Sequence, residues 1–317
     1  MMKNYLKSEI KYGFYSKLYY KMFALICILV CGIQFINYSA VMEMKGNYDR
    51  KVEFYNGDIE AMQEDLNGEF KVTVSADGKS GMIENPILYY KTMLSQYVSY
   101  IHPDNVITQL EEMSLIIIPI VFSLFGAIYV SLDDKYRMKK LKTIRNSKFS
   151  YIKMKQISML VSALMIAVSG VVFGIISNRI FFMLVKNKID MSLVDISLSK
   201  TDLKTEFARL SIILLSIFVF LELGALLAAV FRNSTMSVCI IFAYLYILHI
   251  PGKYELLNCI NYLYDKFFDF KGIVNVELAY DNFNFAIVLC ELILLVLISI
   301  VIKFYIETKR SSFEAIN

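Results

Sequence analysis

The sequence predicts an all-α polytopic membrane protein with six transmembrane helices, an N-terminal amphipathic interfacial helix and a small α+β extracellular insertion between spans 1 and 2. Of the 317 residues, 57% are hydrophobic and only 20% are charged, and the mean hydropathy is +0.52. A soluble domain usually has about a quarter charged and somewhat under half apolar residues. The apolar residues also gather in long runs, and the basic residues are divided unevenly among the connections between them.

A hydrocarbon core of about 30 Å needs roughly 20 apolar residues in a helix. The runs of about this size are 22–42, 113–132, 157–182, 210–231, 235–250 and 285–306. Residues 232–234 alone join the fourth and fifth runs, which predicts a tight antiparallel hairpin. The first run is longer than the core of a secretory signal, about 7–15 residues, and no small-x-small cleavage site follows it. We therefore expect a retained helix there.

The basic residues orient the chain. Residues 133–156 contain nine lysines and arginines against Asp133 and Asp134, which is typical of a cytoplasmic connection. The segments expected inside are 1–21, 133–156, 232–234 and the tail 307–317. The segments expected outside are 43–112, with six basic and thirteen acidic residues, 183–209 and 251–284. Both termini are then cytoplasmic. A composition rich in Lys, Ile, Asn and Tyr indicates an AT-rich bacterial genome, so we expect the bacterial plasma membrane.

The segment 1–21 places four apolar residues four positions apart, with Lys7 and Lys11 beside them. The apolar positions are Leu6, Ile10, Phe14 and Leu18. This pattern predicts an amphipathic helix at the anionic inner leaflet. The alternative is a simple cluster of lysines that orients the first span.

The segment 43–112 mixes strand and helix signals. Alternation predicts strands near Val52 and Phe54 and over residues 70–74. The other expected features are a short helix over 58–66, a turn at 76–78, a helix over 86–101 and a turn or helix start at 103–104. Gly78-Lys79-Ser80 resembles the end of a phosphate-binding loop, but residue 73, where its first glycine belongs, is threonine. We therefore interpret it as a hairpin turn.

Composition argues against several function classes. Two histidines in different segments, His102 and His249, make a metal centre improbable. Four of the five cysteines fall in apolar runs, which offers no disulfide framework. The net charge of +4 is divided between the two sides of the membrane, which disfavours nucleic-acid binding. We expect no cofactor, no metal and no enzymatic activity in this chain.

Charged groups inside spans cost on the order of 2.5–3.5 kcal/mol by insertion scales and therefore suggest function. Glu222 lies in the middle of the fourth run, and Glu291 lies near the start of the sixth. No lysine, arginine or histidine is placed centrally in another run. Glu222 could relay protons, or it could bond neighbouring helices or line a cavity. Pro119 is expected to loosen the second span. These three residues are our candidates for a translocation pathway.

Two sequence stretches then suggest a family. Residues 133–155 read DDKYRMKKLKTIRNSKFSYIKMK, with Tyr-Arg at 136–137, Leu-Lys-Thr at 141–143 and closing lysines. Residues 223–234 read LGALLAAVFRNS. Together with the order of helices and loops, these stretches resemble the permease subunits of type-2 ABC exporters over nearly the whole chain. Lys139, Lys148 and Tyr151 stand where that family usually has glycine, proline and arginine.

The resemblance implies a partner and a set of coupling residues. Energy would come from a separate cytoplasmic ABC ATPase, docked on the basic loop through Tyr136, Arg137, Leu141, Thr143 and Ser147. Two permease subunits, a second copy or a related chain, would pair in the bilayer. The expected cargo is amphipathic, such as an antimicrobial peptide or a drug. Two alternatives stay open: a membrane-anchored sensor or immunity protein that binds a peptide outside, and an ion-coupled secondary transporter that uses Glu222.

Overall fold

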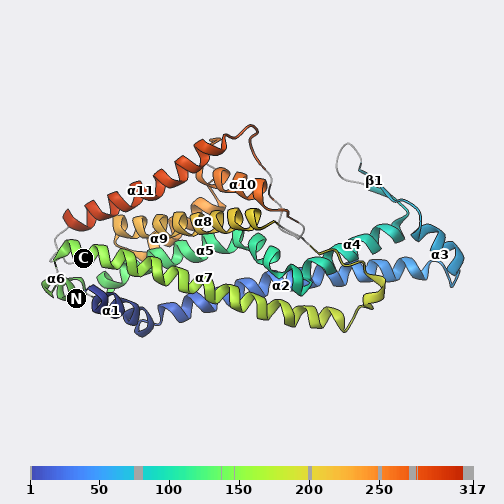
Figure 1. Cartoon of the computed structure of the whole chain (residues 1–317), viewed down its shortest axis with the longest axis horizontal. Coiled ribbons are helices and arrows are strands. Elements are labelled where there is room, and N and C mark those ends of the chain that lie inside the picture. Colours follow the sequence, from blue (N-terminus) through green and yellow to red (C-terminus); the bar gives the residue numbers. More distant parts are fainter. Residues whose placement is uncertain are drawn as a thin grey trace.

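The computed structural model describes residues 2–74, 81–136, 138–145, 147–198, 202–248, 252–270, 276 and 278–309. These residues form an elongated helical bundle with one two-stranded sheet (Figure 1). Helices α1 (Met2–Tyr15) and α6 (Met138–Arg145) lie at one end, which we call the base, together with the C-terminal end of the last helix. The sheet lies near the opposite end.

Among the described residues, five helices are long and apolar enough to cross a membrane, which supports a multi-pass membrane protein. They are α2 (Leu18–Glu53), α5 (Val106–Lys135), α7 (Lys148–Lys186), α8 (Leu203–Phe231) and α11 (Phe285–Lys309). Each contains one predicted run and extends beyond it.

The predicted fifth span is shorter than expected. Helix α9 (Ser234–Tyr246) has 13 residues, or about 20 Å at 1.5 Å per residue, which is less than a bilayer core. The expected hairpin with α8 is present, because α8 and α9 pack together and Arg232 adopts a left-handed turn between them at φ 54°. A further helix, α10 (Leu256–Phe267), lies in the segment expected outside and packs on α8 and α11.

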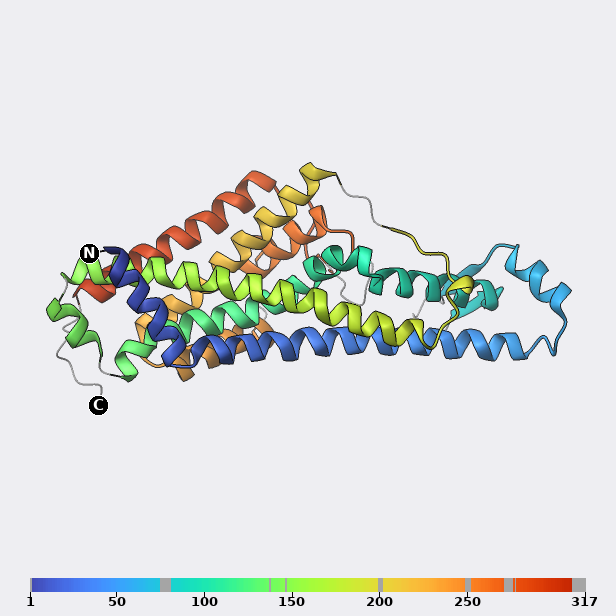
Figure 2. The same cartoon turned by 60° about the horizontal axis from the view of Figure 1, so that its bottom comes forward.

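Two of the long helices exceed what a bilayer requires. Helices α2 and α7 have 36 and 39 residues, or about 54 and 58 Å. Their ends away from the base pack with α4 (Pro86–Ile101), and we call this three-helix part the stalk (Figure 2). Its core contains Val41 of α2, Leu94 and Val98 of α4, and Val185 of α7.

The stalk ends in a small α+β tip, as the sequence predicts. Asp58 accepts a hydrogen bond from the backbone N–H of Ala61 and so begins α3 (Ile59–Leu66). Strands β1 (Lys71–Val74) and β2 (Gly81–Glu84) pair antiparallel.

Three predictions for this segment have clear outcomes. The helix over 86–101 is confirmed as α4, and a short 3₁₀ helix occupies Pro103–Asn105. The strand expected near Val52 and Phe54 is wrong, because α2 continues to Glu53. The turn at 76–78 and Gly78-Lys79-Ser80 lie outside the described residues.

Helices α5 and α8 form the most extensive helix pair of the bundle, and glycines allow their close approach. A Cβ atom built on Gly126 of α5 would lie 2.2 Å from the carbonyl oxygen of Leu221. One built on Gly224 of α8 would lie 2.0 Å from the carbonyl oxygen of Ser123. Small residues that let two backbones meet are typical of helix contacts within membranes.

The N-terminal helix packs against the bundle instead of continuing α2. Lys17, at φ 60°, separates α1 from α2, and α1 lies against α7. Its buried positions include Glu9 and Gly13, whereas Phe14 is 44% exposed. The apolar side chains predicted to line one helix face therefore fall on two helices, because Leu18 is the first residue of α2.

Candidate functional site

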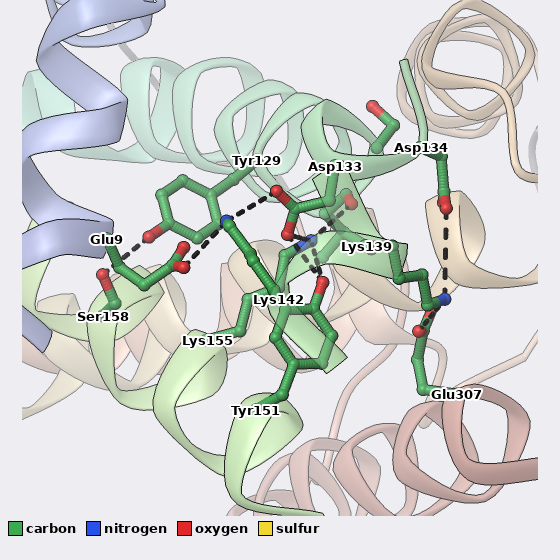
Figure 3. A network of polar contacts seen from close by, with 12 residues as sticks. Glu9, Tyr129, Asp133, Asp134, Lys139, Lys142, Tyr151, Lys155, Ser158 and Glu307 are labelled. Atoms are coloured by element: carbon green, nitrogen blue, oxygen red, sulfur yellow. Dashed lines mark hydrogen bonds and ion pairs between the residues drawn. The ribbon is translucent and has the colours of Figure 1, made fainter. Parts of the chain in front are cut away.

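The basic connection between α5 and α7 is organised by a polar network at the base (Figure 3). The network joins α1, α5, α6, α7 and α11. Its charged members are Glu9, Asp133, Asp134, Lys139, Lys142, Lys155 and Glu307. We call it the basal network.

Asp133, near the end of α5, is the centre of the network and is only 1% exposed. Its Oδ1 atom accepts a hydrogen bond from Lys142 of α6 at 2.7 Å. Its Oδ2 atom accepts from Lys155 of α7 at 2.8 Å and from the Tyr151 hydroxyl at 2.6 Å. One carboxylate therefore fixes three side chains from two following helices.

Lys142 links α6 to α1 as well. Its Nζ atom lies 2.7 Å from Glu9 Oε1, and 4.4 Å from the ring centroid of Tyr12 in a cation–π contact. Burial, followed by the negative charge of Asp133, raises the pKa of the Tyr12 phenol well above its usual range. Tyr12 therefore stays neutral at physiological pH.

A second set of contacts links α6 and the start of α7 to α11. Lys139 of α6 forms an ion pair with Glu307 of α11 and lies 4.0 Å from Asp134. Lys148, the first residue of α7, donates to the carbonyl oxygen of Thr308 at 2.7 Å. Helix α6 is therefore tied by ion pairs to α1, α5 and α11, and through Asp133 to α7.

The coupling residues expected from the sequence lie beside this network. Tyr136 ends α5 and packs edge-on against Tyr12 at 6.4 Å between ring centroids. The Thr143 hydroxyl donates to a carbonyl of its own helix, and Ser147 caps α7 by accepting from the backbone N–H of Ser150. Arg137 lies outside the described residues, as does the side chain of Leu141.

Sequence reasoning missed the ionic partners. The sequence pattern marks Asp133 only as a charge in the basic connection, and it does not mark Glu9 or Glu307. A carboxylate placed beside nine cations was the available signal for Asp133, but no local spacing connects it with Glu9 or Glu307.

Large apolar side chains are exposed on α6 and on the residues that flank it. Ile144 of α6 is 71% exposed, Phe149 at the start of α7 is 61% exposed and Tyr136 is 50% exposed. Such exposed side chains beside a basic helix are typical of a protein contact surface.

The pathway candidates are not brought together. Glu222 is 0% exposed and forms an ion pair with Lys303 of α11 and a hydrogen bond with Gln156 of α7. A cationic partner was not expected from the sequence, because Lys303 lies only three residues before the end of the sixth run. Glu291 lies twelve residues from Lys303 on α11, or about 18 Å along the helix, and contacts Cys259. Pro119 is buried within α5.

A cavity of about 90 Å³ lies between α2, α5, α7 and α8. Its lining is almost entirely apolar and includes Ile26, Val30, Phe122, Val171 and Ile217, with Ser114 as a polar member. None of the three pathway candidates lines it.

Within the described residues, no group of three or more His, Cys, Asp or Glu side chains is arranged to hold a metal ion. No family model, no curated protein and no solved structure matches this chain.

Proposed function

We propose that this chain is the membrane-spanning permease subunit of an ATP-driven ABC exporter of type 2. It works with a separate cytoplasmic ATPase and pairs in the bilayer with a second copy or a related permease. In this proposal the base faces the cytoplasm, both termini lie there, and the stalk projects from the outer surface of the bacterial plasma membrane.

The observation that carries the proposal is the connection of α6 by ion pairs to three other helices, α1, α5 and α11. A short helix at the end of a bundle can couple a partner protein to transport only if its own displacement is transmitted to the membrane-spanning helices. Lys142 joins α6 to Glu9 and Asp133, and Lys139 joins it to Glu307. These ion pairs are largely buried, so they are screened less by salt than surface pairs.

The surface of α6 supports docking of a partner. The exposed side chains of Tyr136, Ile144 and Phe149 offer apolar contact area, and Lys135 and Lys153, which are also exposed, offer charge for an acidic cleft. The sequence also contains no complete phosphate-binding loop. The energy source therefore belongs to another subunit in this proposal.

The cargo class is amphipathic. The cavity between α2, α5, α7 and α8 is apolar apart from Ser114, and its volume of about 90 Å³ suits a few methylene groups of such a cargo. The tight contact of α5 and α8 at Gly126 and Gly224 provides an axis about which neighbouring helices can move.

The test is copurification with a co-expressed ABC ATPase, preferably one encoded beside this chain. We expect a stable complex and, with an Ile144→Cys variant in a cysteine-free background, a crosslink from α6 to the ATPase. A membrane-anchored sensor has no reason to hold an ATPase. An ion-coupled transporter would transport without one and would lose its pH dependence in Glu222→Gln.

Orientation is tested in the same background with a membrane-impermeant maleimide on intact cells. Ile59→Cys, at the tip, is expected to react, whereas Ile144→Cys is expected to react only after the cells are opened. Reaction of Ile144→Cys in intact cells would place α6 outside and end the proposal.

A further inference from the structure

The tip of the stalk exposes more large apolar side chains than a water-facing element needs. We define the tip as the described residues 51–74 and 81–87. Phe54 is 74% exposed, Met82 is 71%, Ile59 is 63% and Val72 is 44%. Burial of one such side chain stabilises a complex by about 1.5–3 kcal/mol, and exposed apolar clusters mark interaction sites.

A hollow beside these residues is large enough to hold a side chain of a ligand. It has a volume of about 210 Å³ and is lined by Lys51, Phe54, Tyr55, Pro86 and Ile87. At about 30 Å³ per water molecule, this is the space of roughly seven waters, or of one leucine- or phenylalanine-sized side chain. The Tyr55 hydroxyl donates to Asp65 at 2.5 Å, which ties the end of α2 to α3 beside the hollow.

The tip is also strongly acidic. It contains seven exposed acidic residues and two basic ones, a formal net charge of −5. The acidic residues are Glu53, Asp58, Glu60, Glu64, Asp65, Glu69 and Glu84. Acidic side chains beside exposed apolar ones favour a ligand with the opposite charge and an apolar side chain of its own.

We propose that the tip binds short cationic peptides with apolar side chains, one of which enters the hollow beside Phe54. The inference rests on the proposed function in one respect, because that function places the tip outside. The Phe54 ring already accepts a cation, since Lys51 Nζ lies 4.9 Å from its centroid. A lysine or arginine of the peptide would form ion pairs with the exposed acidic side chains of the tip.

Charge also argues against two other occupants. A second copy of the tip would bring two surfaces of −5 together, and like charges oppose such a contact. A membrane rich in anionic lipid would repel the tip for the same reason.

The experiment measures peptide binding to the full chain in nanodiscs of neutral phosphatidylcholine, without ATPase or nucleotide. The probe is a fluorescently labelled 18-residue peptide of lysine and leucine with one cationic and one apolar helix face. The matched probe has glutamate in place of lysine. By fluorescence anisotropy we expect saturable binding of the lysine peptide, weaker at higher salt, and no binding of the glutamate peptide. Binding of both probes, or equal binding to empty nanodiscs, would overturn the proposal.

Two variants locate the site. Glu60→Lys with Glu64→Lys is expected to weaken binding about tenfold, which corresponds to about 1.4 kcal/mol, and Phe54→Ser is expected to weaken it about fivefold. The control, Asp265→Lys with Asp281→Lys, makes the same charge change at exposed positions on and beside α10, which packs on α8 and α11. All five positions are exposed, so the fold is retained, as an unchanged size-exclusion profile verifies.

An equal loss in the control pair would show that binding follows overall charge and not the tip. Full binding in the two tip variants would equally remove the site. Because no ATPase is present, failure of peptide binding leaves the ATPase copurification result intact. The reverse also holds, so the two proposals fail independently.

Discussion

The ammonium group of Lys142 on α6 lies 2.7 Å from Oδ1 of Asp133 on α5, and this pair is buried at the base of the bundle. Removal of one partner from a buried ion pair typically costs about 3–5 kcal/mol, because the remaining charge is left uncompensated. The pair therefore gives a sharp test of the basal network.

Asp133→Asn is expected to lower the stability of the folded protein by about 3–5 kcal/mol, because Lys142 and Lys155 both lose their carboxylate. Asp134→Asn is the matched control, since Asp134 is more exposed and lies 4.0 Å from Lys139; we expect a loss under about 1 kcal/mol. Thermal unfolding followed by fluorescence-detected size exclusion measures both. Equal losses would contradict the central position of Asp133.

The contact of α5 with α8 depends on Gly126. We expect Gly126→Ala to separate the two helices and destabilise the protein by more than about 2 kcal/mol, since the new Cβ atom would meet the Leu221 carbonyl at 2.2 Å. Gly32→Ala is the control, because no atom lies within 4 Å of its Cβ position; there we expect no loss, or a gain of about 0.5–1 kcal/mol. The same unfolding assay compares them. A harmless Gly126→Ala would mean that this contact is looser than described.

The pair of Glu222 and Lys303 is expected to act as a unit. Glu222→Gln and Lys303→Met should each destabilise the protein, whereas the double variant should be more stable than the sum of the two losses predicts. A double-mutant cycle of unfolding free energies measures the coupling. Additive losses would indicate that the two side chains act separately.

Cys259 of α10 provides a pH-dependent test. Burial, followed by the negative charge of Glu291, raises the pKa of its thiol to about 12. The thiolate is the reactive form, so below pH 12 its fraction rises about tenfold per pH unit. In a variant with Cys259 as its single cysteine, labelled with ¹³C at Cβ because the 0% exposed thiol is closed to maleimide, the Cβ resonance should still be titrating at the upper end of the range from pH 7 to pH 10. Ile59→Cys in a cysteine-free chain, with an ordinary thiol pKa of about 8.5, should level off within that range. A plateau for Cys259 below pH 10 would contradict its described surroundings.

Apolar runs predicted the long helices well, because a bilayer requires every spanning backbone group to bond within its own helix. Pro86 likewise marked the start of α4, since proline is favoured at the first helical position. Hydropathy was less informative about length. The fifth run covers residues 235–250, but α9 ends at Tyr246, a few residues before Pro251, and residues preceding proline disfavour the helix.

The strand predicted near Val52 and Phe54 rested on a short alternation, which is weak evidence against continuation of a helix that has already formed. Alternation at Val52 and Phe54 covers three residues, whereas extension of an existing helix adds one hydrogen bond for each residue fixed. The basal network could not be predicted from the sequence for a different reason. Glu9, Asp133 and Glu307 are separated by more than 100 residues of chain, and only the packed bundle brings their cationic partners together.

Helix α2 runs without a proline from Leu18, beside α1, to Glu53 at the tip. A rod about 54 Å long turns a tilt of about 5° at one end into a swing of roughly 5 Å at the other. In the orientation that we propose, this single helix would carry such a tilt from one side of the bilayer to the other, with no relay of side chains between them.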